Sequence, residues 1–405
     1  MLEALLKHVV ILGGGYSGIY ALQKLVSNTN IKITLIDKHT YHNLQPEVYD
    51  LIANKGTIAD VTIDLSSLCS GFEHPFLEYK NLRVTNIDYE NNQLLTQEEE
   101  IVRFDYLLIA VGTRTFFPNN IEGLNNTNDL KKLHKALYFK QNFENQLFKK
   151  IEDEAKKCDK THIAVVGAGL SGVEIAAEMA YYAKQFFKRG SFPCDNFRIS
   201  LISSRSTILP GFDQKMIRMS SQRLKELDIN IITDTKMTSC DSEYLYLSNG
   251  TQIQYSFIIF AGGIEAANLI LRSKLPKNDK GQLKTDEFLH VEGYDNIFAA
   301  GDIAEVKSKE ELMPANVTIA RATGTTAAQN ILNQIAKKKL QPCKPKLEGT
   351  LIALGGKYAV CDLYGLVKVK GFIGYLIKQY VFFRYKLPLL RFIKKGYNKL
   401  SHNSK

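Results

Sequence analysis

Two glycine-rich turns with the same spacing constrain this 405-residue chain more than any other feature. They are Gly13-Gly14-Gly15-Tyr16-Ser17-Gly18 and Gly167-Ala168-Gly169-Leu170-Ser171-Gly172, and each follows a short apolar run. In a G-x-G-x-x-G turn between a strand and a helix, the glycines allow a tight turn, close approach of the backbone to a pyrophosphate, and close packing of the helix. The amino end of the helix then faces the phosphates. Two copies predict two dinucleotide-binding units of the doubly wound α/β class.

The first copy lies in a complete strand-helix-strand pattern. Residues 8–12 predict a strand, residues 19–26 an apolar-periodic helix, and residues 31–36 a second strand that ends at Asp37. Asp37 follows Gly18 by 19 residues, near the roughly 20 at which a carboxylate accepts hydrogen bonds from an adenosine ribose. An ordinary aspartate at a strand end is the alternative.

The second copy differs at the matching position. Residues 162–166 predict its strand, residues 172–182 its helix, and residues 197–202 the next strand, which is followed by Ser203-Ser204-Arg205. A carboxylate at that strand end would repel a 2′-phosphate, whereas two hydroxyls and a guanidinium suit one. The sequence therefore favours NADPH as a donor, and a solvated loop arginine is the alternative.

The composition is that of an ordinary globular protein, with 45% hydrophobic and 23% charged residues, and the length suits two to three domains. Residues 1–7 lack the basic region, apolar stretch and cleavage site of a signal peptide, which predicts a cytoplasmic location. Six cysteines show no close pair, no C-x-x-C and no metal-ligand spacing. We expect free thiols and no bound metal.

The positive charge is concentrated at the carboxyl end. From residue 363 to residue 405 there are ten Lys or Arg and no Asp or Glu, so this tail carries the whole net charge of +10. Aromatic and aliphatic residues stand between the bases, and Pro388 predicts a division into two helices. The bases interrupt every stretch that could span a bilayer, which favours amphipathic helices on a membrane surface.

A homodimer interface is an alternative for this tail, because an apolar face does not say what covers it. Nucleic acid is disfavoured, since base stacking needs aromatics on an open platform, whereas these aromatics stand in dense apolar runs. We therefore expect a peripheral protein on the cytoplasmic face of a membrane, attached through residues 363–405.

Three further apolar runs end in turns that close the two units. Residues 104–113 and residues 255–263 each predict a buried strand with a glycine turn, at Gly112 and at Gly262. A third run ends at Gly301-Asp302, where a carboxylate beside a helix start can accept hydrogen bonds from a ribityl or pyrophosphate group.

This third run is expected to return the chain to its first unit. The sequence then divides into a discontinuous domain of residues 1–118 and 285–340, a second domain of residues 119–284, and a tail region of residues 341–405. Within the tail region, residues 347–360 predict a strand.

Several of these segments together resemble one known family. They are residues 9–15, Tyr41-His42-Asn43-Leu44-Gln45-Pro46, residues 106–112, Gly172-Val173-Glu174, Ala300-Gly301-Asp302 and residues 370–373. The chain resembles the flavoproteins with two dinucleotide-binding domains, and within them the type II NADH:quinone oxidoreductases, which are monotopic respiratory enzymes. The resemblance covers nearly the whole chain, and the Tyr-His loop with its Gln-Pro is its most specific part.

The resemblance implies an α/β fold with two Rossmann-like domains of the glutathione reductase type, FAD on the first turn and NAD(P)H on the second. The implied FAD contacts are Gly13, Gly14, Gly15, Tyr16, Ser17, Gly18, Asp37, Lys38, Val84, Gly112, Gly301, Asp302 and Ile319. The implied NAD(P)H contacts are Gly167, Gly169, Gly172, Ser203, Ser204, Arg205 and Gly262. Glu174 would lie near the nicotinamide as the catalytic residue, and a plain partner of the helix N-terminus is the alternative.

The implied activity is hydride transfer from NAD(P)H to the flavin, followed by transfer of two electrons to a membrane quinone, without proton pumping.

One segment departs from the family. The family carries two glutamines beside the quinone, whereas residues 315–321 of this chain contain none. Asn316, Ala320 and Arg321 are the candidates for quinone contact, and a different quinone or an altered acceptor stays open.

Three other functions are alternatives. A disulfide reductase would need a cysteine pair beside the flavin, and Cys69 stands alone in its region. A sulfide:quinone oxidoreductase shares the fold but reacts through cysteines, so Cys158, Cys343 or Cys361 would have to meet in the fold. The third alternative is a slow flavoprotein whose redox state controls its association with a membrane or partner.

Overall fold

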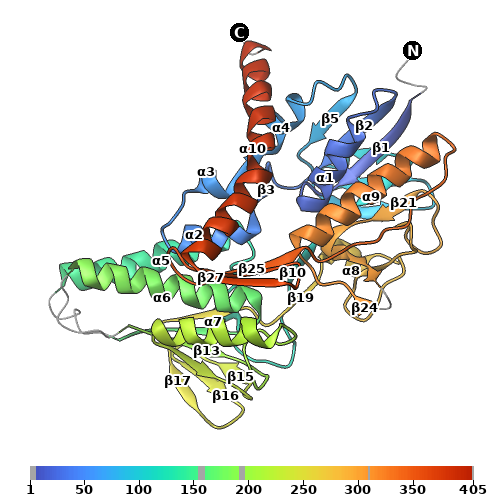
Figure 1. The fold of residues 1–405 in the computed structure, drawn as a ribbon. Coiled ribbons are helices and arrows are strands. Elements are labelled where there is room, and N and C mark those ends of the chain that lie inside the picture. Colours follow the sequence, from blue (N-terminus) through green and yellow to red (C-terminus); the bar gives the residue numbers. More distant parts are fainter. Residues whose placement is uncertain (1–5, 154–159, 191–196, 309–310, 404–405) are drawn as a thin grey trace.

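Two five-stranded parallel sheets organise the chain (Figure 1), and the computed structural model describes residues 6–153, 160–190, 197–308 and 311–403. The first sheet has the order β21-β9-β1-β2-β5. Its strands are β1 (Lys7–Leu12), β2 (Ile31–Ile36), β5 (Leu77–Lys80), β9 (Tyr106–Ile109) and β21 (Ile297–Ala299). The second sheet has the order β11-β18-β12-β13-β14. Its strands are β11 (Thr127–Asn128), β12 (Thr161–Val166), β13 (Phe197–Ile202), β14 (Ile229–Ile232) and β18 (Phe257–Phe260).

The two sheets are copies of one plan. In each, a central strand leads through a glycine turn into a helix, α1 (Tyr16–Leu25) or α6 (Leu170–Gly190), and a neighbouring parallel strand follows. In each, a three-stranded antiparallel meander precedes the next parallel strand. The meanders are β6 (Val84–Asp88), β7 (Gln93–Thr96) and β8 (Ile101–Arg103), and β15 (Met237–Cys240), β16 (Tyr244–Leu247) and β17 (Gln252–Gln254). The predicted α/β fold with two Rossmann-like units is confirmed.

The central strands are buried on both faces, which explains their continuous apolar sequence. Val9, Val10 and Ile11 of β1 have no exposed surface, and Val9 pairs with Ile33 of β2. Helices α1 and α9 (Val317–Ile335) pack on the first sheet, and its meander faces it across the residues His8, Lys32 and Thr34. Helix α9 packs so closely on α1 that a Cβ on its Gly324 would lie 2.2 Å from the Ser17 carbonyl oxygen.

Two short antiparallel strands join the halves. They are β10 (Thr113–Thr115) and β19 (Ile264–Ala266), and an ion pair of 2.8 Å between Arg114 and Glu265 lies across them. The remaining helices of these halves are α2 (Val48–Ile52), α3 (Ile58–Val61), α4 (Leu65–Ser70), α5 (Leu133–Glu152), α7 (Gln214–Glu226) and α8 (Asn268–Arg272), with the short helices η2 (Gln45–Glu47), η3 (Leu124–Asn126) and η5 (Gly301–Ile303). The remaining strands are β3 (Tyr41–Asn43), β4 (Thr62–Asp64), β20 (Leu283–Lys284), β22 (Ala304–Glu305), β23 (Lys307–Ser308) and β24 (Glu311–Leu312).

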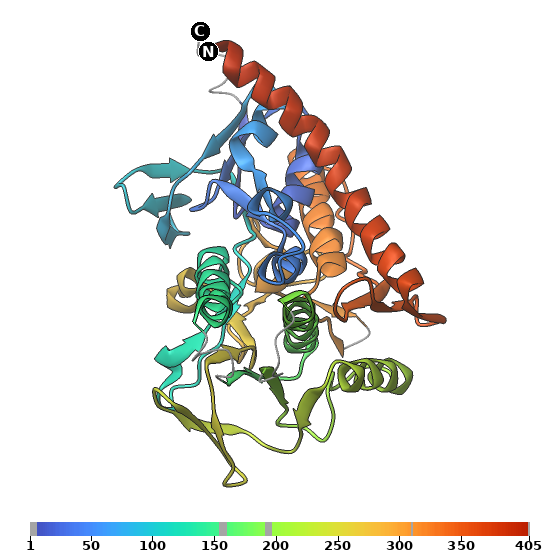
Figure 2. The ribbon, with the colours of Figure 1, turned by 90° about the vertical axis from the view of Figure 1, so that its left-hand side faces the viewer.

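The carboxyl end forms a three-stranded antiparallel sheet and one long helix. The sheet is β25 (Gly349–Ala353), β26 (Ala359–Leu363) and β27 (Val367–Gly371), and the helix is α10 (Phe372–Asn403). Figure 2 shows α10 running along one side of the molecule, where it packs on α4. The prediction of one strand over residues 347–360 is therefore wrong, because a turn with positive φ at Gly355 and Gly356 makes two strands of it.

The prediction that Pro388 divides the tail into two helices is also wrong. Pro388 lies inside α10. A proline removes one backbone hydrogen bond and crowds one turn, but α10 packs against α4 beyond this point, with the rings of Phe392 and Phe72 4.4 Å apart. The helix therefore continues through Pro388 to Asn403. In the second unit, α6 also extends further than the predicted residues 172–182.

Candidate functional site

The first glycine of each turn occupies the same strained position. Gly13 has φ of +114° and Gly167 has φ of +110°, where residues with side chains are strained. A Cβ at Gly13 would lie 2.4 Å from the carbonyl oxygen of Ala110, and a Cβ at Gly167 would lie 2.4 Å from that of Ala261. Both turns therefore require glycine here for the fold itself.

The second glycine of each turn (Gly15, Gly169) has open space around it, whereas the third (Gly18, Gly172) is closely packed. A Cβ at Gly18 would lie 1.9 Å from the carbonyl oxygen of Gly13, and one at Gly172 would lie 1.8 Å from that of Gly167. A Cβ at Gly169, by contrast, would meet no atom within 4 Å, and one at Gly15 would meet its nearest atom at 3.9 Å. The fold therefore needs no glycine at these second positions, and the open space fits a pyrophosphate that approaches the backbone.

Asp37 faces the first turn from the end of β2. Its Oδ2 accepts a hydrogen bond of 2.7 Å from the backbone amide of Gly14, and its Oδ1 accepts one of 2.8 Å from that of His39. The carboxylate is thereby fixed beside the glycine turn, and its remaining lone pairs suit ribose hydroxyls. Lys38 follows it, with an exposed side chain, and Val84 begins β6.

The Gly301-Asp302 turn lies against the same part of the first unit. Gly301 has φ of +78° and donates its amide to the Thr323 hydroxyl at 2.9 Å, and Ser17 donates to the Ala300 carbonyl at 3.2 Å. Asp302 accepts a hydrogen bond of 3.4 Å from the hydroxyl of Thr113.

Two more predicted FAD contacts lie beside these groups. A Cβ at Gly112, next to Thr113, would meet no atom within 4 Å. Ile319 is buried in the first turn of α9. The first turn, Thr113 beside Gly112, Asp302 and α9 are thus linked by hydrogen bonds, and the space around Gly15 and Gly112 fits a dinucleotide.

The second turn faces a different strand end. Ser203 is buried and donates to the Thr207 carbonyl at 2.9 Å, whereas Ser204 and Arg205 are exposed. Within the described part of the chain, the guanidinium of Arg205 has no hydrogen bond or ion pair. Gly262 lies under the Phe260 ring, which a Cβ there would approach to 2.7 Å.

Glu174 lies in the first turns of α6 and is buried. Its Oε1 accepts a hydrogen bond of 2.9 Å from the amide of Ala353 in β25. Burial raises the pKa of Glu174 to about 8. One turn further along α6, the fully buried Glu178 accepts hydrogen bonds from Lys55 at 2.9 Å and from the Gly356 amide at 3.3 Å.

These two glutamates belong to a buried cluster of charges. Lys378 of α10 lies 3.1 Å from Asp50 and 3.6 Å from Glu47, and Lys55 lies 2.5 Å from Asp50. Four carboxyl groups thus share two ammonium groups. Burial raises the pKa of Glu47 to about 7, against the opposing charge of Lys378. The cluster can therefore hold protons at neutral pH.

Sequence reasoning missed most of this cluster. Asp50, Lys55, Glu178 and Lys378 carry no motif, and they come from segments far apart in the chain. The resemblance had named Glu174, and the quoted Tyr-His loop leads into Glu47.

The predicted quinone contacts lie at the start of α9. Asn316 caps this helix, since its Oδ1 accepts a hydrogen bond of 2.8 Å from the amide of Ile319. Ala320 is buried, and Arg321 is paired with Glu348. The amide oxygen of Asn316 and the guanidinium of Arg321 are thus already engaged by the protein.

A cluster of aromatic rings joins α10 to the first turn. The hydroxyl of Tyr385 lies 2.9 Å from Nε2 of His42, and its ring centroid is 5.0 Å from that of Tyr16. Burial lowers the pKa of His42 to about 4, so that this imidazole is neutral at pH 7.

The described cysteines are free thiols. Burial raises the pKa of Cys69 to about 12 and that of Cys361 to about 11. Since the thiolate is the reactive form, these two side chains are unsuited to redox chemistry at neutral pH. Cys158, which the sulfide alternative invoked, lies outside the described residues, as does Cys194.

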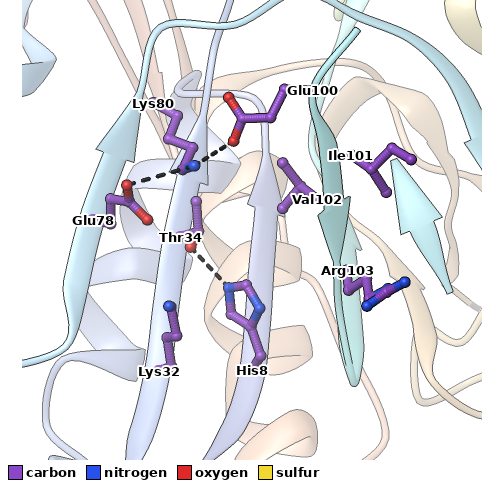
Figure 3. A pocket seen from close by; sticks show the side chains of 9 residues that line it. All are labelled: His8, Lys32, Thr34, Glu78, Lys80, Glu100, Ile101, Val102 and Arg103. Atoms are coloured by element: carbon purple, nitrogen blue, oxygen red, sulfur yellow. Dashed lines mark hydrogen bonds and ion pairs between the residues drawn. The ribbon is translucent and has the colours of Figure 1, made fainter. Parts of the chain in front are cut away.

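A cavity of about 460 Å³ lies elsewhere, between the face of the first sheet and its meander (Figure 3). Its lining is His8, Lys32, Thr34, Glu78, Lys80, Glu100, Ile101, Val102 and Arg103. Lys80 pairs with Glu78 and Glu100, and the His8 ring lies 2.8 Å from the Thr34 hydroxyl. Because ligands of doubly wound folds bind at the carboxyl ends of strands, this cavity is separate from the site above.

Two doubly wound units, joined by paired strands and each carrying an open glycine turn, define a protein with two dinucleotide-binding sites. The model of the pyridine nucleotide-disulphide oxidoreductase family matches residues 7–324, and the chain belongs to that family.

Curated relatives and solved structures are similar over nearly the whole chain. Demethylphylloquinone reductase NdbB of Synechocystis is 28% identical over 94% of this chain and 92% of its own length. A type II NADH:quinone oxidoreductase of Haemophilus influenzae is 26% identical over 88% of this chain and 87% of its own. The structure of NDH2 from Plasmodium falciparum in complex with NADH has a TM-score of 0.82 at 20% identity, covering 96% of this chain and 97% of that one. The resemblance inferred from the sequence is confirmed.

Proposed function

We propose that this protein is a peripheral membrane flavoenzyme that oxidises NAD(P)H and reduces a membrane quinone. The observation that carries the proposal is the pair of glycine turns, each with open space at its second glycine. Beside them lie the fixed carboxylate of Asp37 in one unit and the exposed guanidinium of Arg205 in the other. The quinone part is supported by the names of the relatives, which reduce quinones.

The residues fall into two binding sets. Residues 1–118 and 285–340 would hold FAD, through Gly13, Gly14, Gly15, Tyr16, Ser17, Gly18, Asp37, Lys38, Val84, Gly112, Gly301, Asp302 and Ile319. Residues 119–284 would hold the nicotinamide nucleotide, through Gly167, Gly169, Gly172, Ser203, Ser204, Arg205 and Gly262. The exposed guanidinium of Arg205 supports acceptance of a 2′-phosphate, and hence of NADPH as well as NADH.

The flavin, when bound, supplies the two-electron chemistry between the nicotinamide and the quinone. The protein's own contribution centres on Glu174. Its pKa of about 8 keeps the carboxyl protonated at neutral pH. Because Oε1 accepts the Ala353 amide, Oε2 is the oxygen that carries the proton. Reduction of a quinone to a quinol consumes two protons, and Glu174 would hold one of them.

Asn316, Ala320 and Arg321 are the proposed quinone contacts. Arg321 would have to leave its ion pair with Glu348 to donate to a quinone carbonyl, and this exposed pair is weak enough to exchange. Asn316 would bind through its amide NH2, since its oxygen caps α9.

The two faces of α10 support membrane attachment through residues 363–405. The inner face is packed on the first unit: Lys378 and Leu389 are buried, and a Cβ at Gly396 would lie 1.8 Å from the Ser67 carbonyl oxygen. The outer face exposes large apolar side chains, namely Phe372, Ile373, Leu376, Tyr380, Val381, Phe383, Leu390 and Tyr397. The exposed bases Arg384, Arg391, Lys394 and Lys399 stand among them. This combination suits an anionic lipid surface.

In the described part of the chain, no helix combines the length and the apolar character needed to cross a bilayer. Attachment would therefore use the outer face of α10, and we propose the cytoplasmic face of the membrane as its place.

The enzymatic proposal is tested by anaerobic stopped-flow mixing of the flavin-loaded protein with NADH, NADPH or sulfide, followed by a short-chain quinone. Fast bleaching by a nicotinamide and fast reoxidation by quinone are expected. Bleaching by sulfide alone would assign the sulfide:quinone reaction instead, and slow reaction with every donor would favour a redox sensor.

The membrane proposal is tested by flotation with vesicles of phosphatidylcholine and phosphatidylserine. Tyr380→Glu combined with Phe383→Glu should abolish binding, because two charges would enter the apolar face. Tyr138→Glu, an equally exposed tyrosine on α5, is the matched control and should bind normally. Unchanged binding of the double variant would refute the proposal, and conversion of a dimer to a monomer without loss of binding would assign this face to a homodimer.

A further inference from the structure

Lys131 connects the start of α5 to the proposed flavin site. Its Nζ donates a hydrogen bond of 2.6 Å to the hydroxyl of Thr113 in β10. The same hydroxyl donates to Oδ2 of Asp302 at 3.4 Å. Three segments of the chain therefore contribute to one series of hydrogen bonds, which runs from an ammonium through a hydroxyl to a carboxylate.

The backbone around Lys131 is fixed by a second pair of contacts. Asp129 is 2% exposed, and its Oδ1 accepts hydrogen bonds from the hydroxyl of Thr115 at 2.6 Å and from the Lys131 amide at 3.1 Å. Thr113 and Thr115 lie on the same side of β10, since they are two residues apart. The segment before α5 is thus held against β10, with the ammonium directed at Thr113.

We propose that Lys131 is a positioning residue for FAD, which acts through Thr113 to keep the Asp302 carboxylate ionised and oriented toward the bound cofactor. The inference rests on the proposed function, in which Asp302 contacts FAD. Lys131 belongs to residues 119–284, the proposed NAD(P)H-binding domain, but would act on the proposed FAD site. No glycine motif or strand end marks its position in the sequence.

The charges of Lys131 and Asp302 support this role. Burial raises the pKa of Asp302, and the charge of Lys131 and the hydrogen bond from Thr113 oppose that rise. Burial lowers the pKa of Lys131, and the charges of Asp302 and Asp129 oppose that fall. Without the ammonium, Asp302 would take up a proton at a higher pH and lose acceptor capacity for cofactor hydroxyls.

A purely structural link between the two halves would behave differently. Its loss would lower the stability of the protein and its affinity for FAD. The affinity would then fall by the same factor at every pH. Loss of a group that keeps Asp302 ionised makes FAD affinity depend on pH, because raising the pH restores the carboxylate.

The test is the dissociation constant of FAD for the full-length protein, measured from the fluorescence of free flavin between pH 6 and pH 9. Lys131→Met should weaken FAD binding about tenfold at pH 6.5, with most of the loss recovered at pH 9, whereas the parent protein changes little. Lys131→Arg should restore affinity. Lys132→Met removes the neighbouring exposed lysine and should bind FAD normally.

Thr113→Val provides a second route if Lys131→Met fails to fold, and it should show the same pH-dependent loss. Parent-like affinity at every pH in the variant that folds, or a loss that is the same at every pH, would overturn the inference. Failure of the parent protein itself to bind FAD would instead refute the proposed function.

Discussion

The ammonium of Lys378 lies 3.1 Å from Oδ2 of Asp50, although 328 positions separate the two residues. Lys378 belongs to the inner face of α10 and Asp50 to α2, and both are buried. The helix proposed to lie on a membrane is thus also part of the protein interior. Its removal would do more than release the protein from lipid, because it would take one of two ammonium groups, that of Lys378, away from the buried carboxyl groups.

Lys378→Met should therefore destabilise the protein by about 3–5 kcal/mol, since removing one partner leaves uncompensated charge in the interior. The free energy of unfolding in urea measures this. Lys394→Met, which removes an exposed lysine of the same helix, should change it by less than about 0.5 kcal/mol. Equal stability of the two variants would mean that the cluster is solvated.

Gly15→Ala and Gly169→Ala should separate the two nucleotide sites. Neither new methyl group meets a protein atom closer than 3.9 Å, so both variants should fold. Gly15→Ala should purify with little FAD, because the methyl group fills the pyrophosphate space. Gly169→Ala should keep FAD and raise the KM for the nicotinamide nucleotide at least about tenfold. Flavin content and steady-state kinetics measure the two effects.

Gly18→Ala is the contrasting change, because its methyl group would lie 1.9 Å from a backbone oxygen. It should lower the melting temperature or prevent soluble expression. A stable Gly18→Ala protein, or a Gly15→Ala protein with full flavin, would contradict the roles assigned to these glycines.

Glu174→Gln should change how stability depends on pH. Burial raises the pKa of Glu174 from 4.5 to about 8. Between these pH values the folded state holds a proton that the unfolded state has released. The free energy of unfolding of the parent protein therefore falls as the pH rises. Glutamine does not ionise and can still accept the Ala353 amide.

The stability of Glu174→Gln relative to the parent should thus increase by about 3 kcal/mol between pH 5 and pH 8. Unfolding free energies at the two pH values measure the difference, and Glu287→Gln, at an exposed position, should show none. A constant difference for Glu174→Gln would mean that the carboxyl ionises normally. Flavin reduction or quinone reduction should also slow in this variant.

Arg205→Glu should shift the donor preference from NADPH toward NADH. The new carboxylate repels the 2′-phosphate and can accept hydrogen bonds from the ribose hydroxyl. We expect the KM for NADPH to rise about 10- to 100-fold, in line with the loss of a charged hydrogen bond. Ratios of kcat/KM for the two donors measure the shift.

Arg198→Glu is the matched control, since it lies at the opposite end of β13 and is also exposed. It should leave the preference unchanged. An unchanged preference in Arg205→Glu as well would make Arg205 a solvated loop residue.

The glycine turns could be predicted from the sequence because their requirements are local. The φ of +114° at Gly13 and the close approach of Gly18 to its own turn are properties of a few consecutive residues. The strand ends at Asp37 and Asp302 follow from apolar runs of fixed length in the same way. The class of fold and the position of the two glycine turns were therefore predictable from the chain.

The buried charge cluster was not readable, because Asp50, Glu178 and Lys378 become neighbours only when both sheets and α10 have packed together. The expectation that a proline ends a helix also failed at Pro388, where packing of α10 on α4 opposes it. The sequence by itself determined the two open turns, since backbone sterics act between adjacent residues. Only the tertiary structure decided where protons are held and which face of α10 is free, since burial and pairing depend on contacts between distant segments.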